Sequence, residues 1–255
     1  LEERGQRQLM SLLATGGQRS AAMQQYLALK NTLWEELGRP PAPETEALLD
    51  RIRNGRSLET GRLDPNAAPR PQASPFIGRQ DDLWRISKSM ADPDSRLLVL
   101  NGPEGSGKTR LALQLANQHV DTFRDGVWFV DASAARDADT LTASIAQCMG
   151  LQFPGGHPLR EQLFEFLAPF ETLLIIDNFA GLAGQTAFLS ELLGATLGVK
   201  ILILCRQRCA PPVACLFELH GLSYPLDLDD PNPLAYPAVQ LFIQNAQRVS
   251  PGFLF

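Results

Sequence analysis

Eight residues near the middle of the chain constrain its fold more than any other stretch. Residues 102–109 read GPEGSGKT and fit the pattern G-x-x-x-x-G-K-[ST]. An apolar run at 97–100 leads into them, and leucines and alanines spaced as on a buried helix follow from Leu111 to Ala116. This order predicts a buried strand, a glycine-rich loop and then a helix.

The residue types in this loop suit the phosphates of a nucleotide. Glycines let backbone N–H groups curl around phosphate oxygens, and the N-terminus of the following helix adds partial positive charge. The stretch resembles the phosphate-binding loop of P-loop NTPases, in which Lys108 would reach the outer phosphates and Thr109 would ligate Mg²⁺. We therefore expect ATP or ADP with Mg²⁺ here. The loop residues expected to bind the nucleotide are Pro103, Glu104, Gly105, Ser106, Gly107, Lys108, Thr109 and Arg110.

A later strand supplies the carboxylate that Mg²⁺ needs. Residues 172–177 read TLLIID, and an apolar run that ends on an acid is typical of a buried parallel strand delivering that acid to the edge of the sheet. This is the Walker B pattern, so Asp177 is expected to hold the Mg²⁺ shell opposite Thr109. Many hydrolytic P-loop ATPases place a glutamate next to activate water, but this chain has Asn178. The sequence supports nucleotide binding but not fast turnover.

Apolar strands alternate with helices through this part of the chain. The predicted strands are 97–100, 126–131, 172–177, 199–205 and 217–220. Their alternation with helices predicts an α/β P-loop NTPase fold with a mostly parallel five-stranded sheet covered by helices. Ligands of such sheets bind at the carboxyl edge of the strands. The catalytic residues predicted to gather there are Lys108, Asp177 and Arg206.

Composition excludes several other classes. The net charge of −5 gives the chain no overall attraction to nucleic acid, and no apolar run approaches the roughly 18 residues of a membrane helix. Four cysteines without a signal peptide indicate a reduced, cytoplasmic setting with no membrane partner. One alternative is a Cys3His zinc site formed by Cys205, Cys209, Cys215 and His220. The spacing matches no common zinc pattern, so buried thiols are the expectation.

The first 54 residues indicate three helices, the second stopping at Gly38. The apolar stripe predicted for that second helix is Met23, Tyr26, Leu27, Leu33, Trp34 and Leu37. The phrases EELG at 35–38 and PET at 43–45 resemble the closing part of the bacterial transcriptional activator domain, a tetratricopeptide-like module. In SARP-type regulators this module follows a winged-helix domain. The resemblance implies that this chain is a piece of a longer protein and reaches DNA only through a domain missing from it, with RNA polymerase as a further candidate partner.

A second resemblance lies before the glycine-rich loop. Residues 76–80, FIGRQ, resemble the hydrophobic-hydrophobic-G-R-E motif of STAND NTPases of the NB-ARC type, with glutamine in place of glutamate. The resemblance implies that Phe76 and Ile77 lie against adenine and that Arg79 helps to hold the nucleotide.

Two further segments resemble the same family. Residues 199–206 resemble the strand that ends in T-S-R, whose arginine senses the terminal phosphate; Arg206 occupies that position, although Leu204 and Cys205 replace the hydroxyl residues. Relatives often carry an acid two positions after Asp-Asn, where this chain has Ala180. The helix predicted around 238–246 resembles the start of the family's small helical lid.

Together these patterns predict four segments: the end of a tetratricopeptide-like domain at 1–55, a proline-rich linker at 56–75, a P-loop NTPase domain of the NB-ARC type at 76–230 and a truncated lid at 231–255. The predicted function is that of an ATP/ADP-binding switch in a STAND-type transcriptional regulator. Nucleotide state would control domain arrangement or self-association, with slow ATP hydrolysis at most. The alternatives are a P-loop kinase or metabolic ATPase acting on a small substrate, for which no acceptor-binding motif is evident, and a protein-interaction module that has lost nucleotide binding.

Overall fold

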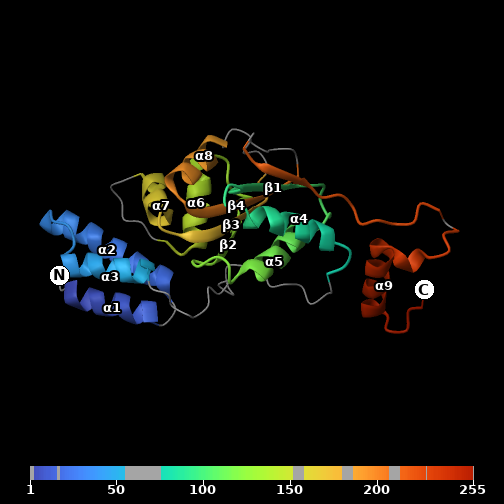
Figure 1. The fold of residues 1–255 in the computed structure, drawn as a ribbon, viewed down its shortest axis with the longest axis horizontal. Coiled ribbons are helices and arrows are strands. Elements are labelled where there is room, and N and C mark those ends of the chain that lie inside the picture. Colours follow the sequence, from blue (N-terminus) through green and yellow to red (C-terminus); the bar gives the residue numbers. More distant parts are fainter. Residues whose placement is uncertain are drawn as a thin grey trace.

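The computed structural model describes residues 3–15, 18–54, 76–151, 158–179, 186–206, 213–227 and 229–254. The linker predicted at 56–75, Ala180 and Cys209 lie outside these ranges. Within them, a group of N-terminal helices is followed by an α/β unit and a C-terminal helix (Figure 1).

Three helices form the N-terminal part, as predicted: α1 (Glu3–Thr15), α2 (Arg19–Leu37) and α3 (Pro43–Asn54). We call them the helical module. Helix α2 ends at Gly38, which has a left-handed φ of 60° and donates its N–H to the carbonyl of Trp34. Between helices, Glu3 accepts hydrogen bonds from the Ala42 backbone N–H and the Thr45 hydroxyl. These contacts fix the start of α1 against the start of α3.

The apolar stripe predicted for α2 was partly wrong. Leu29 and Leu33 are buried, whereas Trp34 and Leu37 are 63% and 51% exposed. Successive residues of an α-helix point in directions about 100° apart, because one turn takes about 3.6 residues. Trp34 therefore turns away from the face on which Leu33 is buried, and the buried stripe runs through Leu29 instead.

The five predicted strands form one sheet. They are β1 (Leu97–Asn101), β2 (Val127–Asp131), β3 (Glu171–Asp177), β4 (Gly198–Cys205) and β5 (Cys215–Glu218). Their order is β2-β3-β4-β1-β5, and every neighbouring pair is parallel. The predicted α/β fold with a parallel sheet is confirmed. Strand β4 lies between the strand that leads into the glycine-rich loop and the strand that ends on Asp177.

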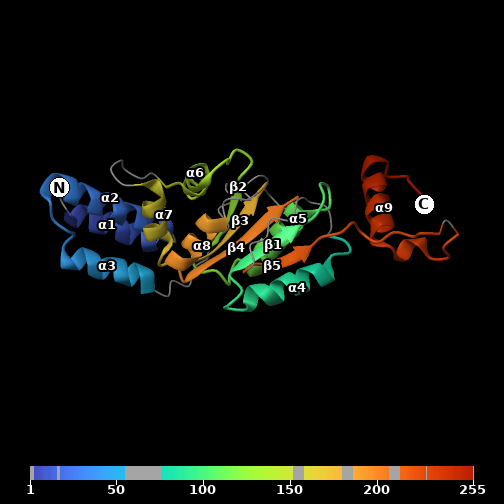
Figure 2. The same ribbon diagram turned by 90° about the horizontal axis from the view of Figure 1, so that it is seen from above.

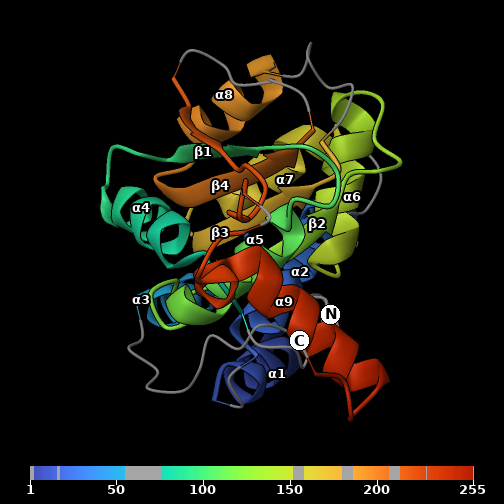
Figure 3. The same ribbon diagram turned by 90° about the vertical axis from the view of Figure 1, so that its right-hand side faces the viewer.

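Helices cover both faces of this sheet (Figures 2 and 3). Alternate strand residues face opposite ways, so Leu98 and Leu100 pack with α4 (Gln80–Ala91) and α5 (Lys108–His119). Leu97 and Val99 belong instead to the cluster that contains α6 (Ala138–Cys148), α7 (Leu159–Leu167) and α8 (Thr186–Ala195). Strands buried on both faces account for the unbroken apolar runs in the sequence.

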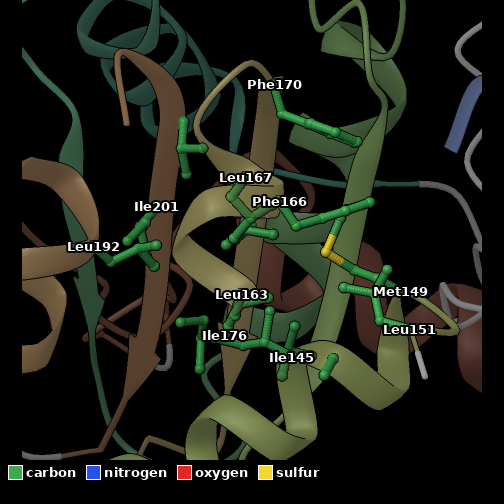
Figure 4. Close-up of a cluster of buried hydrophobic side chains, with 14 of the residues drawn as sticks. Ile145, Met149, Leu151, Leu163, Phe166, Leu167, Phe170, Ile176, Leu192 and Ile201 are labelled. Carbon is green, nitrogen blue, oxygen red and sulfur yellow. The ribbon is translucent and has the colours of Figure 1, made fainter. Parts of the chain in front are cut away.

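The second of these clusters is the larger core. Figure 4 shows Ile145 of α6 and Leu163 and Phe166 of α7 gathered beside Ile176 of β3 and Ile201 of β4. Its buried members continue into the helical module, with Met10, Ala22, Met23, Tyr26, Leu49 and Ile52. The helical module and the α/β unit thus share one apolar core.

The C-terminal part follows the sheet. A short 3-10 helix, η1 (Pro233–Ala235), precedes α9 (Pro237–Val249), which lies at the end of the molecule opposite the helical module (Figure 1). No side chain of α9 is buried. Among the described residues, no helix is long and apolar enough to cross a membrane.

Candidate nucleotide-binding site

The glycine-rich loop connects β1 to α5 at the carboxyl edge of the sheet. Gly105 and Gly107 have φ angles of 77° and 92°, a conformation that favours glycine. A Cβ built on either residue would meet nothing within 4 Å, so the loop is open on that side. Gly102, in contrast, is packed: a Cβ there would lie 2.5 Å from the carbonyl oxygen of Leu219. The loop is anchored at its start and open at its middle.

The polar side chains of the loop meet in a small volume. Lys108 Nζ donates to the carbonyl oxygens of Gly102 and Pro103, both at 2.8 Å. Burial lowers the pKa of the Lys108 ammonium, and the Asp177 carboxylate acts in the opposite direction. Thr109 Oγ1 donates to Asp177 Oδ2 at 2.8 Å, which joins the first turn of α5 to the end of β3. The fold thus brings Lys108 and Thr109 of the glycine-rich loop together with Asp177 of the Walker B pattern.

These groups fit the phosphates of a nucleotide and a Mg²⁺ ion. Among the described residues, the Ser106 hydroxyl is one of two buried side-chain polar atoms without a hydrogen-bond partner. The first N–H groups of a helix such as α5 also lack intrahelical acceptors. An anion in the open loop would accept hydrogen bonds from such donors, and hydroxyl and carboxylate oxygens are ligands that Mg²⁺ prefers.

Arg79 braces the loop through its backbone. Its guanidinium donates to the Ser106 carbonyl at 3.0 Å, to the His220 carbonyl at 2.6 Å and to Asp82 Oδ2 at 3.1 Å. The side chain therefore joins α4, the glycine-rich loop and the segment after β5. These hydrogen bonds hold the glycine-rich loop in shape.

The other residues of the FIGRQ motif lie close by. The Arg110 guanidinium lies 5.9 Å from the centre of the Phe76 ring, and Ile77 is half-buried. Gly78 contacts the start of α9: a Cβ built on Gly78 would lie 2.2 Å from the Pro237 Cβ. The motif therefore lies between the glycine-rich loop and the C-terminal helix.

Arg206 reaches the glycine-rich loop from the end of β4. Its guanidinium forms an ion pair with Glu104 at 3.0 Å, and both side chains are largely exposed. Strand β4 is the sheet neighbour of β1, which brings the two groups to the same edge. Glu104 of the loop thus pairs with Arg206, the arginine that the sequence predicted to sense a phosphate.

Sequence reasoning missed one acid at this edge. Asp131 ends β2 and is the register partner of Asp177 on β3. Its carboxylate accepts hydrogen bonds from Asn178 Nδ2 and from the Ser133 backbone N–H and hydroxyl, each at 3.0 Å. The Asn178 amide is the main cause that holds the pKa of Asp131 below its ordinary value. The sequence did contain a signal for Asp131, because VWFVD at 127–131 repeats the pattern of an apolar strand that ends on aspartate.

Comparisons with known proteins agree with this architecture. Residues 1–53 match the family model of the bacterial transcriptional activator domain, and residues 92–208 match that of an AAA domain. The fold and the site define a protein with a P-loop NTPase fold, preceded by helices that are similar to the bacterial transcriptional activator domain.

The chain also has curated relatives. It is 29% identical over 272 residues to the regulatory protein AfsR of Streptomyces griseus, a match that covers 98% of this chain and 26% of AfsR. It is 33% identical over 160 residues to a Mycobacterium tuberculosis protein named as an HTH-type transcriptional regulator, which covers 62% of this chain and 17% of that protein. The chain thus spans a minor part of these relatives. Over the matched residues the chain is similar to these regulators, and its α/β unit has a P-loop NTPase fold.

Two solved structures match part of this chain. The Orc1 protein of Aeropyrum pernix in complex with DNA matches 69% of this chain and 56% of its own, with a TM-score of 0.48 at 15% identity. A STAND protein with a tetratricopeptide repeat sensor from Pyrococcus horikoshii matches 65% of this chain and 25% of its own, with a TM-score of 0.41 at 17% identity.

Proposed function

We propose that this chain is the nucleotide-binding switch of a cytoplasmic transcriptional regulator. ATP or ADP with Mg²⁺ binds at the carboxyl edge of the sheet, and the terminal phosphate selects between two arrangements of the domains. The observation that carries this proposal is the 2.8 Å hydrogen bond between Thr109 and Asp177 beside the open glycine-rich loop. It pairs the two oxygens between which P-loop proteins hold their metal ion.

Each side chain has a role in this proposal. Lys108, now bonded to loop carbonyls, binds the outer phosphates, while Thr109 and Asp177 hold Mg²⁺. A bound Mg²⁺ supplies charge neutralisation for the phosphates. Arg206 binds the terminal phosphate, and the half-buried side chains of Phe76 and Ile77 lie against the base.

A switch is favoured over a fast enzyme because of the residue after Asp177. An asparagine amide is not a base, so Asn178 cannot take the proton of an attacking water. Its amide nitrogen is also engaged with Asp131. Hydrolysis is therefore slow, and a given nucleotide persists long enough to set the arrangement of the domains.

The proposed units are the helical domain at 1–55, the linker at 56–75, the NTPase domain at 76–230 and the beginning of a lid at 231–255. In the ATP state the NTPase domains self-associate. DNA is contacted through a domain outside this chain, as the HTH-type name of the mycobacterial relative suggests, and RNA polymerase is the partner proposed for the regulator as a whole.

Calorimetry on the purified chain tests the proposal. Lys108→Ala should weaken the binding of ATP and ADP by about 10- to 150-fold, because it removes a charge-assisted contact worth about 1.5–3 kcal/mol. Lys88→Ala, on the exposed side of α4, is the matched control and should bind normally. Unchanged affinity in Lys108→Ala, with a melting temperature equal to that of the parent, would overturn the assignment. A turnover above about 1 s⁻¹ would favour the kinase or metabolic ATPase alternative.

A further inference from the structure

The backbone at Asn178 adopts an unusual conformation. Among the described residues it is the one non-glycine residue with a positive φ, at 58°. Asparagine tolerates this left-handed region better than most residues do, but the surroundings must still enforce it. In this conformation the Asn178 backbone N–H donates to Asp177 Oδ1 at 2.7 Å, while its side-chain Nδ2 donates to Asp131 Oδ1 at 3.0 Å. One residue thus connects two carboxylates on neighbouring strands.

Asp131 is itself held in place. The Ser133 backbone N–H bonds to its Oδ1 and the Ser133 hydroxyl to its Oδ2, so both carboxylate oxygens have donors. Asp177 is held from both sides as well, with Thr109 at Oδ2 and Asn178 at Oδ1. The bonds therefore run without interruption from β2 through Asn178 and Asp177 to the first turn of α5.

We propose that Asp131 is a positioning residue for the Mg²⁺ ligand Asp177 and that it acts through Asn178. This inference rests on the proposed function. Asp131 holds the Asn178 side chain, which keeps the Asn178 backbone N–H aimed at Asp177 Oδ1 and so fixes the plane of that carboxylate. The side-chain amide at position 178 is specific: with a carboxylate there, three acids would gather at the edge, and Asp131 would face an acceptor in place of the donor Nδ2.

Exchanging the side chains at positions 131 and 178 provides the test. In Asn178→Asp the contact becomes a repulsion between two carboxylates, and the affinity for ATP in Mg²⁺ should fall about tenfold, the usual cost of losing an outer-sphere partner of a metal ligand. The affinity for ATP in EDTA should fall less, because only the repulsion by the added charge acts there. Adding Asp131→Asn restores one amide and one carboxylate, so the double variant should bind ATP in Mg²⁺ within about threefold of the parent. Adding Asp139→Asn to Asn178→Asp instead removes one charge at an exposed aspartate on α6 and should not restore the affinity.

Calorimetry with and without Mg²⁺, together with melting curves without nucleotide, separates the outcomes. A double variant as weak as Asn178→Asp would overturn the proposal, as would an Asn178→Asp variant that binds ATP in Mg²⁺ normally or more tightly. If the parent chain binds no nucleotide, the proposed function fails. If the parent and Lys108→Ala behave as proposed but the two substitutions act independently, only this inference fails.

Discussion

Among single residues, Glu104 and Arg206 form the contact that distinguishes this loop from a simple phosphate cradle. Their ion pair joins the glycine-rich loop to the end of β4 at 3.0 Å. A terminal phosphate and the Glu104 carboxylate are both anions that a guanidinium would bind. Under the proposed function, Glu104 would therefore compete with the terminal phosphate of ATP for Arg206, whereas ADP lacks that phosphate.

The substitution Glu104→Gln tests this competition. Exposed ion pairs contribute about 0.2–1 kcal/mol, so the affinity for ATP should rise by at most about fivefold, and the affinity for ADP should rise less. Calorimetric titration with each nucleotide measures both. Glu165→Gln, an exposed residue on α7, is the control and should change neither affinity. Equal gains for ATP and ADP would show a general charge effect rather than competition for Arg206.

Among the secondary-structure elements, the start of α9 is fixed by its contact with the FIGRQ motif. Gly78 has a φ of 71°, and the ring of Pro237 occupies the space where a side chain at Gly78 would stand. Arg79, the next residue, binds the glycine-rich loop through the Ser106 carbonyl. The loop and α9 are therefore connected through two adjacent residues.

Gly78→Ala should separate α9 from the loop. The added Cβ would lie 2.2 and 2.6 Å from Pro237 ring carbons, and the left-handed backbone adds strain. Overpacking and such strain each cost about 1–3 kcal/mol, which corresponds to a fall in melting temperature of roughly 2–4 °C per kcal/mol. Gly221→Ala is the matched control, because a Cβ there meets nothing within 4 Å. A normal melting temperature in Gly78→Ala would contradict the close contact.

On the scale of the whole molecule, the helical module is attached to the α/β unit at the end of α6. Gln24 of α2 donates its side-chain Nε2 to the carbonyl oxygens of Met149 and Gly150, each at 3.2 Å. These carbonyls follow the last turn of α6, where a helix leaves acceptors unsatisfied. The shared apolar core lies beside them. Helix α6 therefore runs from near the Asp131 edge of the site to the helical module.

Gln24→Ala should loosen this attachment. Net hydrogen-bond contributions are about 0.5–1.5 kcal/mol each, so the chain should lose roughly 1–3 kcal/mol of stability. Hydrogen exchange should quicken at the end of α6 and in α2 before it quickens in β3 or β4. Gln147→Ala, exposed on α6, serves as the reference. Exchange that rises equally throughout the sheet would show that Gln24 acts on global stability rather than on the attachment.

Local patterns in the sequence determined much of this protein. The spacing of glycines, Lys108 and Thr109, and the apolar run ending on Asp177, predicted the parts of the site, because a loop and a strand end are properties of neighbouring residues. Alternating apolar segments predicted the five parallel strands for the same reason. The stripe of α2 failed at Trp34 because burial depends on which helix faces which, and not on apolar character alone.

Only the tertiary structure decided which strand ends meet. Placing β4 between β1 and β3 brought Arg206 to Glu104, and pairing β2 with β3 brought Asp131 beside Asn178. Strand order and register depend on hydrogen bonds and packing between residues far apart in the chain, and no local periodicity records them. The sequence by itself therefore specified a candidate nucleotide site, while the contacts that hold Asp177 and join the α/β unit to the helical module came from the folded chain.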